Sequence, residues 1–272
     1  MNQLDEFLKE RPSHLKSICR SPKSGNGFFF QSPEFNPKYL IKIQDLHCGE
    51  VELKNLELFE ATGAQPGNLL VEAWQNEEAL GIVLKNIQEH PPTQQHGHKL
   101  YHQLAKVHAT KADSYGLDYH NTIGALPQKN LRTDNWAHFW VHQRLEPWYK
   151  KHATKFDLSL PKVTELLSNH TPEPSLIHGD LWNGNVLFDG QWWFIDPACY
   201  FGDPEVDLAM AQLFGGFPTT FLHAFEQRYH KHSDFLKRQQ VYQLFFLLVH
   251  LELFGHSYLS PCQEIGREIE NW

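Results

Sequence analysis

The chain has no excess of positive charge and no long hydrophobic run. Lys and Arg together number 24 against 32 Asp and Glu, which gives a formal net charge of −8 with histidine neutral. A surface that binds nucleic acid needs clustered positive charge, and Lys and Arg form no cluster here. The longest apolar run, Leu244 to Val249, is far shorter than a membrane span. We therefore expect neither a nucleic-acid partner nor a membrane partner.

Cysteine is scarce, and no two cysteines form a CxxC pair. Such spacing is typical of a protein from a reducing compartment and does not fit a disulfide framework. The first ten residues mix charged and apolar side chains and lack the apolar core of a signal peptide. These features predict free thiols and a cytoplasmic location. The cysteines are Cys19, Cys48, Cys199 and Cys262.

Low-complexity stretches and internal repeats are also absent from the 272 residues. The hydrophobic fraction of 41% and the charged fraction of 21% are those of a globular protein and exclude a disordered chain. A chain of this length can form one large or two modest domains, and we expect two lobes. The sequence indicates no particular oligomeric state.

The first third of the chain predicts strands with one helix. Three runs rich in β-branched and apolar residues, 38–44, 69–74 and 80–87, are predicted to be strands. Between the first and the second, apolar residues recur at helical spacing over 50–61. The predicted order is therefore strand, helix, strand, strand.

From Pro91 onward the pattern is mainly helical. The exception is a pair of β-like stretches, 185–188 and 192–195, which flank Asp189-Gly190. This dipeptide favours a tight turn because both positions tolerate positive φ, so a hairpin is predicted inside the helical region. Apolar residues recur at helical spacing in 100–107, 136–143, 163–167 and 235–254.

Asp180 and Asn185 carry the first chemical signal, in the stretch His178 to Asn185 (HGDLWNGN). Four residues separate them, the spacing of a kinase catalytic loop, in which the Asp accepts a hydroxyl proton and the Asn holds magnesium. Asp196 follows the predicted hairpin, where a second metal-binding carboxylate belongs, and magnesium prefers such oxygen ligands. The alternative is that these residues only form turns and helix caps. Their occurrence together, in register, favours the catalytic interpretation.

Lys42 lies in the middle of an apolar predicted strand, where a buried amine is costly unless it meets negative charge. It could instead point to solvent. Glu52 lies ten residues on, and Leu56 and Phe59 follow it at helical spacing, which places Glu52 at the edge of the core. A Lys42–Glu52 ion pair would direct the lysine at nucleotide phosphates. Glu50 is a nearby competitor for the same role.

Two further segments are candidates for nucleotide contact. A glycine-rich phosphate loop should precede the lysine strand, and the candidate is Ser24-Gly25-Asn26-Gly27, which a plain turn explains equally well. Contacts to adenine are expected from the backbone of Lys85, Asn86 and Ile87, at the end of the third strand.

The acceptor is predicted to be small. Only ten residues separate Asp196 from Asp207, which leaves no room for a long segment that docks a peptide. The acceptor is therefore a small molecule or a small adduct on a protein. We interpret Glu205 and Asp207 as residues that cap the next helix through its dipole, with catalysis as the alternative.

The chain resembles the fructosamine (ketosamine) 3-kinases, and in particular the bacterial-type members of that family. The resemblance implies an α+β, protein-kinase-like bilobal fold. Its small β-rich N-lobe, residues 1–88, would bind nucleotide, and its larger, mostly helical C-lobe, residues 89–272, would hold the catalytic and acceptor-binding residues. The matching stretches are Leu176–Asn185, Ile195–Ala209 and Leu213–Pro218, with further likeness at Pro127–Asn130, Trp136, Phe139 and Gln143–Leu145.

The resemblance also implies a reaction, in which the γ-phosphate of ATP passes to the 3-hydroxyl of a ketosamine with Mg²⁺ as cofactor. The acceptor would be a ribulosamine, erythrulosamine or fructosamine on a small amine or a protein lysine. Because the phosphorylated adduct is unstable in that family, the reaction amounts to deglycation. The implied roles are Asp180 as proton acceptor, Asn185 and Asp196 on magnesium, Lys42 and Glu52 on the phosphates, and Lys85, Asn86 and Ile87 at adenine.

The acceptor side is less defined by the residues. Trp182, Tyr200 and Phe201 could form a flat platform for a sugar amine, although packing around the loop explains them equally well. Trp182 is the preferred contact, with His178 as a second candidate. Other interpretations of the chain are a kinase of the aminoglycoside or choline type and, less favoured, a nucleotide-binding scaffold without activity.

Overall fold

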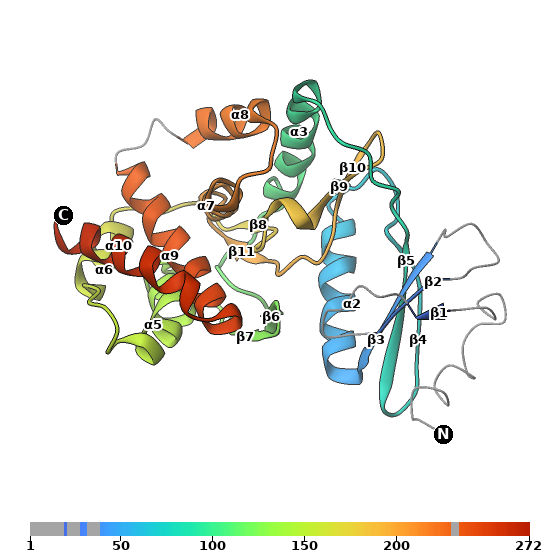
Figure 1. Ribbon diagram of the computed structural model, residues 1–272, viewed down its shortest axis with the longest axis horizontal. Helices are drawn as coiled ribbons and strands as arrows, with labels where there is room; N and C mark the ends of the chain where they lie inside the picture. The colour runs from blue at the N-terminus through green and yellow to red at the C-terminus, as the bar shows by residue number, and fades with distance from the viewer. Residues whose placement is uncertain (1–18, 21–27, 32–38, 230–233) are drawn as a thin grey trace. The chain divides into compact units, whose positions relative to one another are not determined.

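The computed structural model describes residues 19–20, 28–31, 39–229 and 234–272 (Figure 1). They group into two compact units. The first unit takes in the described residues up to Pro91 together with Leu187–Asp196, and the second takes in Pro92–Val186 and Pro197–Trp272. The predicted lobe boundary lies between residues 88 and 89, whereas the hairpin segment 187–196 groups with the first unit.

The first unit is built on a five-stranded antiparallel sheet in the order β1-β2-β3-β5-β4. β3 lies in the middle, and Lys42 on it pairs with Phe29 of β2 and with Ile82 of β5. The three predicted strands are confirmed to within two residues at each end. The strands are β1 (Cys19–Arg20), β2 (Phe28–Gln31), β3 (Tyr39–Asp45), β4 (Leu70–Gln75) and β5 (Ala79–Lys85).

The predicted helix of this unit is α2 (Leu46–Glu60), which begins four residues earlier than the apolar spacing indicates. Asp45 causes the early start, because its carboxylate accepts a hydrogen bond from the backbone N–H of Cys48 at 3.0 Å. Figure 1 shows α2 packed beside β3 and β5. The core between helix and sheet consists of Leu56, Leu69, Leu80, Ile82, Leu84, Ile87 and Trp193.

The predicted hairpin is confirmed as β9 (Val186–Phe188) and β10 (Trp192–Phe194). Gly190 in its turn has φ +99°, a conformation that favours glycine. Gln65, which follows α2, bonds the backbone of Phe194 in both directions, donating to its carbonyl at 2.6 Å and accepting from its N–H at 3.1 Å. These bonds and the buried ring of Trp193 explain why the hairpin joins the first unit.

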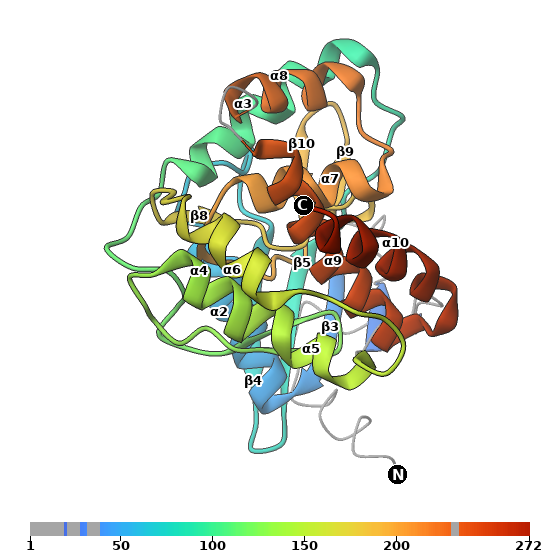
Figure 2. The ribbon, with the colours of Figure 1, turned by 90° about the vertical axis from the view of Figure 1, so that its left-hand side faces the viewer.

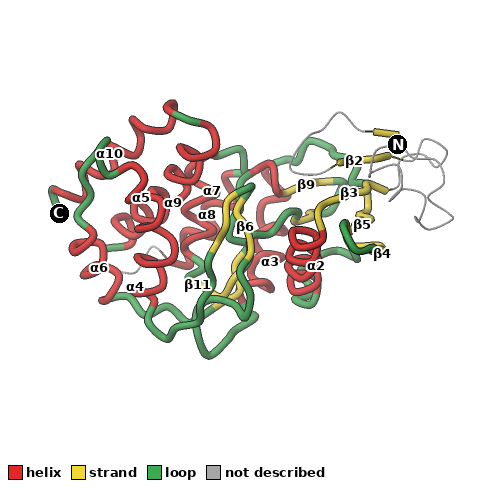
Figure 3. The backbone as a smooth tube through the Cα atoms, turned by 90° about the horizontal axis from the view of Figure 1, so that it is seen from below, coloured by secondary structure: helices red, strands yellow, loops and turns green. Residues whose placement is uncertain are grey.

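The second unit is mainly helical, as expected, with two small sheets (Figures 2 and 3). α9 runs from Phe235 to Phe254, the bounds that its apolar pattern predicts. Within the described part of the chain, no helix combines the length and apolar character needed to cross a bilayer. The longer helices are α3 (Gly97–His108), α5 (Glu146–His152), α6 (Leu160–Ser168), α7 (Glu205–Phe214), α8 (Thr219–Tyr229), α9 and α10 (Leu259–Glu270).

The segment 136–143, predicted as one regular helix, is interrupted. α4 (Trp136–Phe139) passes into a π-helical turn, η3 (Trp140–Leu145), before α5 begins at Glu146. Such wide turns often lie at functional sites. Six strands were not predicted from the sequence. Two are β1 and β2 of the first unit, and the other four form the pairs β6 (Asn121–Ile123) with β7 (Leu126–Gln128) and β8 (Ser175–Ile177) with β11 (Tyr200–Gly202).

Candidate functional site

Asp180 and Asn185 lie together in one loop of the second unit. The Asn185 side chain is buried, and its Nδ2 donates to the Asp180 carbonyl at 2.9 Å and to Asp180 Oδ2 at 3.0 Å. The short helix η4 (Asn183–Asn185) turns the chain so that the two side chains meet. Because the amide nitrogen is directed at Asp180, Oδ1 of Asn185 is the atom left to ligate a hard cation.

The carboxylate of Asp207 holds this loop through hydrogen bonds to its backbone. This carboxylate is fully buried and accepts hydrogen bonds from the backbone N–H of His178 and of Gly179, each at 2.9 Å. His108, at the end of α3, lies 2.9 Å from the same carboxylate and donates to it. Three donors offset the cost of burying the charge. Asp207 lies in the first turn of α7, as expected, but its carboxylate also anchors the catalytic-type loop, a role that the sequence did not predict.

Because residue 179 is a glycine, the loop that carries Asp180 can lie against the residues that follow Asp196-Pro197. Gly179 has φ +79°, and a Cβ there would lie 2.3 Å from the carbonyl oxygen of Ala198. Any side chain at this position would displace one of the two segments. The same Ala198 carbonyl accepts a hydrogen bond from Gln128 Nε2 at 3.0 Å. A single oxygen thus lies between the loop and the β6–β7 hairpin.

A buried network of amides extends from Gln128. Gln128 donates to Asn121 Oδ1 at 2.9 Å, and Asn121 in turn donates to the Cys199 carbonyl at 2.8 Å. Asn130 also donates to Asn121 Oδ1 at 2.8 Å, and Arg144 donates to Asn130 Oδ1 at 2.6 Å. We call Asn121, Gln128, Asn130 and Arg144 the amide network. It fixes the main chain at positions 198 and 199 through side chains rather than a sheet ladder.

Arg144, in the π-helical turn, is fully buried without a carboxylate among its described partners. Its guanidinium lies 4.0 Å from the centre of the Tyr200 ring and 4.6 Å from that of Phe139, and it donates to the Lys129 carbonyl. Burial lowers the pKa of Arg144, although Tyr200 acts in the opposite direction. Tyr200 and Phe201 are buried, so packing is the correct interpretation of both rings.

In the first unit, Lys42 and Glu52 form the expected ion pair. Lys42 Nζ lies 2.7 Å from Glu52 Oε2 and 3.5 Å from Asp196 Oδ1. Burial by itself lowers the pKa of Lys42, but attraction from Asp196 and Glu52 outweighs burial and leaves the pKa raised. The lysine is therefore a charged ammonium held by two carboxylates. Among the described residues the competitor Glu50 is not part of this pair.

Asp196 has an unusual backbone conformation for a residue with a side chain. Its φ is +49°, in the left-handed region, where a non-glycine residue is strained. The carboxylate is 48% exposed, unlike the enclosed Glu52 at 14%. Such a half-open carboxylate beside a lysine fits a magnesium ligand, because the ion takes its ligands from oxygen and keeps water among them.

The segment expected to contact adenine follows β5. The backbone N–H of Lys85 is bonded to the Leu69 carbonyl at 2.8 Å, and its Nζ lies 4.1 Å from the centre of the Trp193 ring. Ile87 is buried in the core of the first unit, whereas Asn86 is half-buried. Any nucleotide contact here would come from the backbone of Asn86 and Ile87. The candidate phosphate loop 24–27 lies outside the described residues.

The two candidate acceptor contacts have opposite exposures. Trp182 is 43% exposed, and its ring lies over Gly184, where a Cβ would come within 2.2 Å of the ring. His178 has no exposed surface, and its Nδ1 accepts from the backbone N–H of Asp180 at 3.3 Å. His178 therefore orients Asp180 and is not available to a substrate, which corrects the expected contact.

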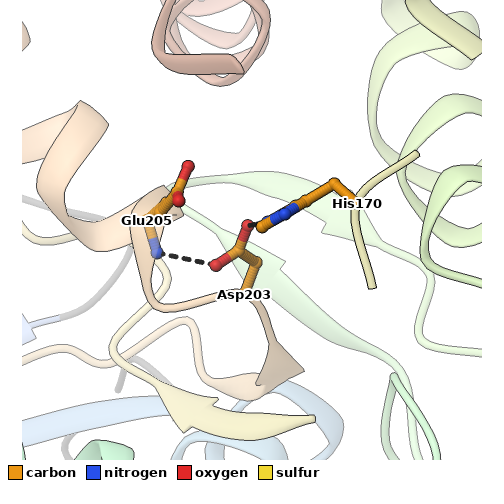
Figure 4. A group of neighbouring side chains, drawn as sticks. All are labelled: His170, Asp203 and Glu205. Carbon is orange, nitrogen blue, oxygen red and sulfur yellow. Dashed lines mark hydrogen bonds and ion pairs between the residues drawn. The ribbon is translucent and has the colours of Figure 1, made fainter. Parts of the chain in front are cut away.

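A second cluster of titratable groups, His170, Asp203 and Glu205, has ligand atoms close enough to hold a metal (Figure 4). The carboxylate oxygens of Asp203 and Glu205 already accept hydrogen bonds from other groups of the protein. Asp203 is bonded to His170 Nε2 at 2.7 Å, to the Tyr242 hydroxyl at 2.7 Å and to the Glu205 N–H at 3.0 Å. Both Glu205 oxygens accept from Arg238, at 2.8 and 2.9 Å. The cluster is an ion-pair network that holds the start of α7.

Comparisons with known proteins show the family and the fold. The model of a family described as fructosamine kinase matches residues 33–271. A probable ketoamine kinase of Vibrio parahaemolyticus is 37% identical over 241 residues, which cover 83% of each chain. A candidate fructosamine-3-kinase of Thermobifida fusca superposes with a TM-score of 0.76 at 27% identity and 94% coverage of both chains.

A protein with lower sequence identity has a similar fold. An aminoglycoside phosphotransferase solved with AMP-PNP and hygromycin B superposes with a TM-score of 0.65 at 16% identity, with 98% of both chains covered. The similarity at this identity concerns the fold alone. Together with the Thermobifida structure it confirms the expected α+β, protein-kinase-like fold.

Proposed function

The chain belongs to the fructosamine kinase family, and from that premise we propose that it transfers the γ-phosphate of ATP to the 3-hydroxyl of a ketosamine. The observation that carries the proposal is the Asp180–Asn185 pair on a loop whose backbone Asp207 anchors. Phosphoryl transfer depends on positioning and on charge stabilisation, and a rigidly held carboxylate supplies the first of these.

Asp180 accepts the proton of the acceptor hydroxyl in this proposal. Asn185 Nδ2 holds one carboxylate oxygen at 3.0 Å, and His178 and Asp207 fix the backbone around it. The carboxylate therefore meets the hydroxyl without first having to be ordered, which lowers the entropic cost of reaction. Asn185 Oδ1 is assigned to magnesium, together with the half-open carboxylate of Asp196.

Lys42 is assigned to the nucleotide phosphates. Glu52 and Asp196 keep it protonated and directed, and the ion pair avoids the cost of an isolated buried charge. When bound, magnesium neutralises negative charge on the phosphates during transfer. Of the three residues expected at adenine, the backbone of Asn86 and Ile87 is assigned to it, because the N–H of Lys85 is bonded to the Leu69 carbonyl.

The acceptor class follows from the family and from the exposed ring of Trp182. A flat indole face stacks on a sugar amine and excludes water from it. We assign ribulosamines, erythrulosamines and fructosamines as acceptors, on small amines or on protein lysines. Phosphorylation at the 3-hydroxyl would destabilise the adduct and release the amine, so the activity would serve deglycation.

The test is ADP release from MgATP with a panel of acceptors. The panel holds a ribulosamine, an erythrulosamine, a fructosamine, choline and an aminoglycoside, each run with the native protein and with Asp180→Asn. The proposal predicts turnover on a ketosamine that is lost in Asp180→Asn and kept in Asp134→Asn, an exposed aspartate of the same unit. Turnover on choline or the aminoglycoside, with none on any ketosamine, would keep the fold and refute the substrate class.

A further inference from the structure

Aromatic side chains remain exposed where α7 and α9 end. Phe214 is the last residue of α7 and is 37% exposed, and Phe254 is the last residue of α9 and is 66% exposed. The two helices pack side by side in the second unit (Figure 2). Large apolar side chains that gather on a surface mark a binding site more often than single exposed ones do.

His250 and Tyr258 join the two phenylalanines into one continuous surface. The His250 ring centre lies 4.5 Å from that of Phe214, 5.3 Å from that of Phe254 and 5.1 Å from that of Tyr258. The Phe254 and Tyr258 rings are 6.2 Å apart. We call these four residues the aromatic strip. Each ring already packs against another ring. The four side chains would therefore lose little conformational entropy when a ligand binds to them.

The polar atoms of the strip are the hydroxyl of Tyr258 and the two ring nitrogens of His250. His250 Nδ1 lies 2.8 Å from the Phe246 carbonyl, and since a carbonyl only accepts, Nδ1 carries the proton. Burial lowers the pKa of His250, which favours the neutral ring, although its bond to the Phe246 carbonyl opposes this. Nε2 of the neutral ring is then an acceptor. The strip thus offers apolar faces and a hydrogen-bond acceptor, with no carboxylate among its four members.

Two glycines connect the strip to the loop that carries Asp180. Gly215 and Gly216, directly after Phe214, have φ +65° and +85°. A Cβ on Gly216 would lie 2.8 Å from Cγ of Asn183, so the chain passes against the loop at a distance that a larger residue would not permit. Asn183 is the neighbour of the exposed Trp182. Phe214, at one end of the strip, is therefore two residues along the chain from the contact with the loop that carries Asp180.

We propose that the aromatic strip is the subsite for the amine-derived part of the acceptor, and that it selects amines with an aromatic or aliphatic side chain. This inference rests on the proposed function. If the 3-hydroxyl of a ketosamine lies at Asp180, its amine substituent extends from the loop, and the strip, which begins at Phe214, is the apolar surface that receives it. Aromatic faces gain stacking and dispersion energy from such a side chain. A polycationic acceptor would find no carboxylate on the strip to recognise its charges.

The test compares two acceptors with the same sugar, ribulose, on phenylalanine and on glycine. They share the amino-acid backbone and differ in the benzyl side chain of phenylalanine. We expect Phe254→Ala and Phe214→Ala to lower the ratio of kcat/KM for the phenylalanine adduct over the glycine adduct by roughly 3- to 10-fold. The loss should lie in KM for the phenylalanine adduct, with KM for ATP unchanged. Both residues are partly or largely exposed, so the variants should fold.

Leu236→Ala is the matched control, because Leu236 lies at the other end of α9 and is 65% exposed. It should leave the ratio unchanged. An unchanged ratio in both phenylalanine variants, or an equal loss on both acceptors, would overturn the subsite. Failure of the native protein to phosphorylate either adduct, or any other ketosamine, would instead refute the proposed function, so the two failures are distinguishable.

Discussion

At the residue scale, buried carboxylates with defined partners account for most of the candidate site. Asp207 serves the main chain of the loop, accepting from His178 N and Gly179 N. Glu52 forms an ion pair with a side chain, that of Lys42. A hydrogen bond to a charged acceptor contributes about 1.5–3 kcal/mol, so each carboxylate fixes its partner strongly. The two residues can therefore be tested separately.

Asp207→Asn should weaken both stability and turnover. The amide that replaces one oxygen would direct N–H groups at a backbone N–H and leave that donor unsatisfied, at a cost of roughly 2–4 kcal/mol. Thermal unfolding should show a lower Tm, and kcat should fall because the Asp180 loop loses its anchor. Asp134→Asn is the control. An unchanged Tm would contradict the anchoring role.

Glu52→Gln should impair nucleotide use without unfolding the chain, because glutamine keeps the shape and an acceptor oxygen but removes the charge that directs Lys42. We expect KM for ATP to rise about tenfold, equivalent to about 1.4 kcal/mol. Glu50→Gln, two residues before the paired position, should leave KM within about twofold. The opposite ranking of the two variants would show that the pair has been assigned to the wrong glutamate.

Spacing along the chain was enough to predict the Lys42–Glu52 pair and the Asp180–Asn185 loop, because the two members of each pair lie within ten residues of one another. It did not reveal the role of Asp207. Two of the three partners of Asp207 are backbone N–H groups 28 and 29 positions earlier in the chain, and backbone groups leave no signature in a sequence. The third partner, His108, lies 99 positions earlier.

At the scale of elements, the length of a sequence pattern determined whether a helix or strand could be predicted. α9 and the β9–β10 hairpin carry a long apolar pattern and a strong turn, and both were predicted. β6, β7, β8 and β11 have three residues each, too few for alternation to be recognised. α2 begins early because Asp45, which ends a strand, also caps the helix. Side-chain hydrogen bonds, not periodicity, set these boundaries.

The β6–β7 hairpin is held by the amide network, which gives an element-scale prediction. In Gln128→Glu the ionised side chain cannot donate to the Ala198 carbonyl or to Asn121 Oδ1, and acceptors then face one another in a buried site. We expect a Tm lower by several degrees and a reduced kcat. Thr122→Ala, on the exposed face of the same hairpin, should change neither. Equal effects of the two variants would contradict a role for the network.

At the scale of the whole molecule, the second unit depends on a buried ion-pair network that joins the chain after α6, the start of α7 and α9. It comprises His170, Asp203, Glu205, Arg238 and Tyr242. Burial raises the pKa of Glu205 to about 7 from 4.5, repulsion from Asp203 adds to this, and the bond to Arg238 opposes it. Stability should therefore depend on pH through Glu205.

The sign follows from the raised pKa. The folded state holds the Glu205 proton more tightly than the unfolded state, so the stability this group contributes is complete below pH 4.5 and is lost as pH rises through about 7. The Tm of the native protein minus that of Glu205→Gln should fall between pH 5 and pH 8. Thermal unfolding of both proteins across this range measures the difference, and a constant difference would contradict the account.

The account's central claim is the site of phosphorylation on the acceptor. The most direct measurement is a ³¹P–¹H correlation spectrum of the product formed from MgATP and a ribulosamine. The account predicts that the new phosphorus couples to the proton on carbon 3 and that no such product forms with Asp180→Asn. A phosphorus coupled to another position, or the same product from Asp180→Asn, would contradict it.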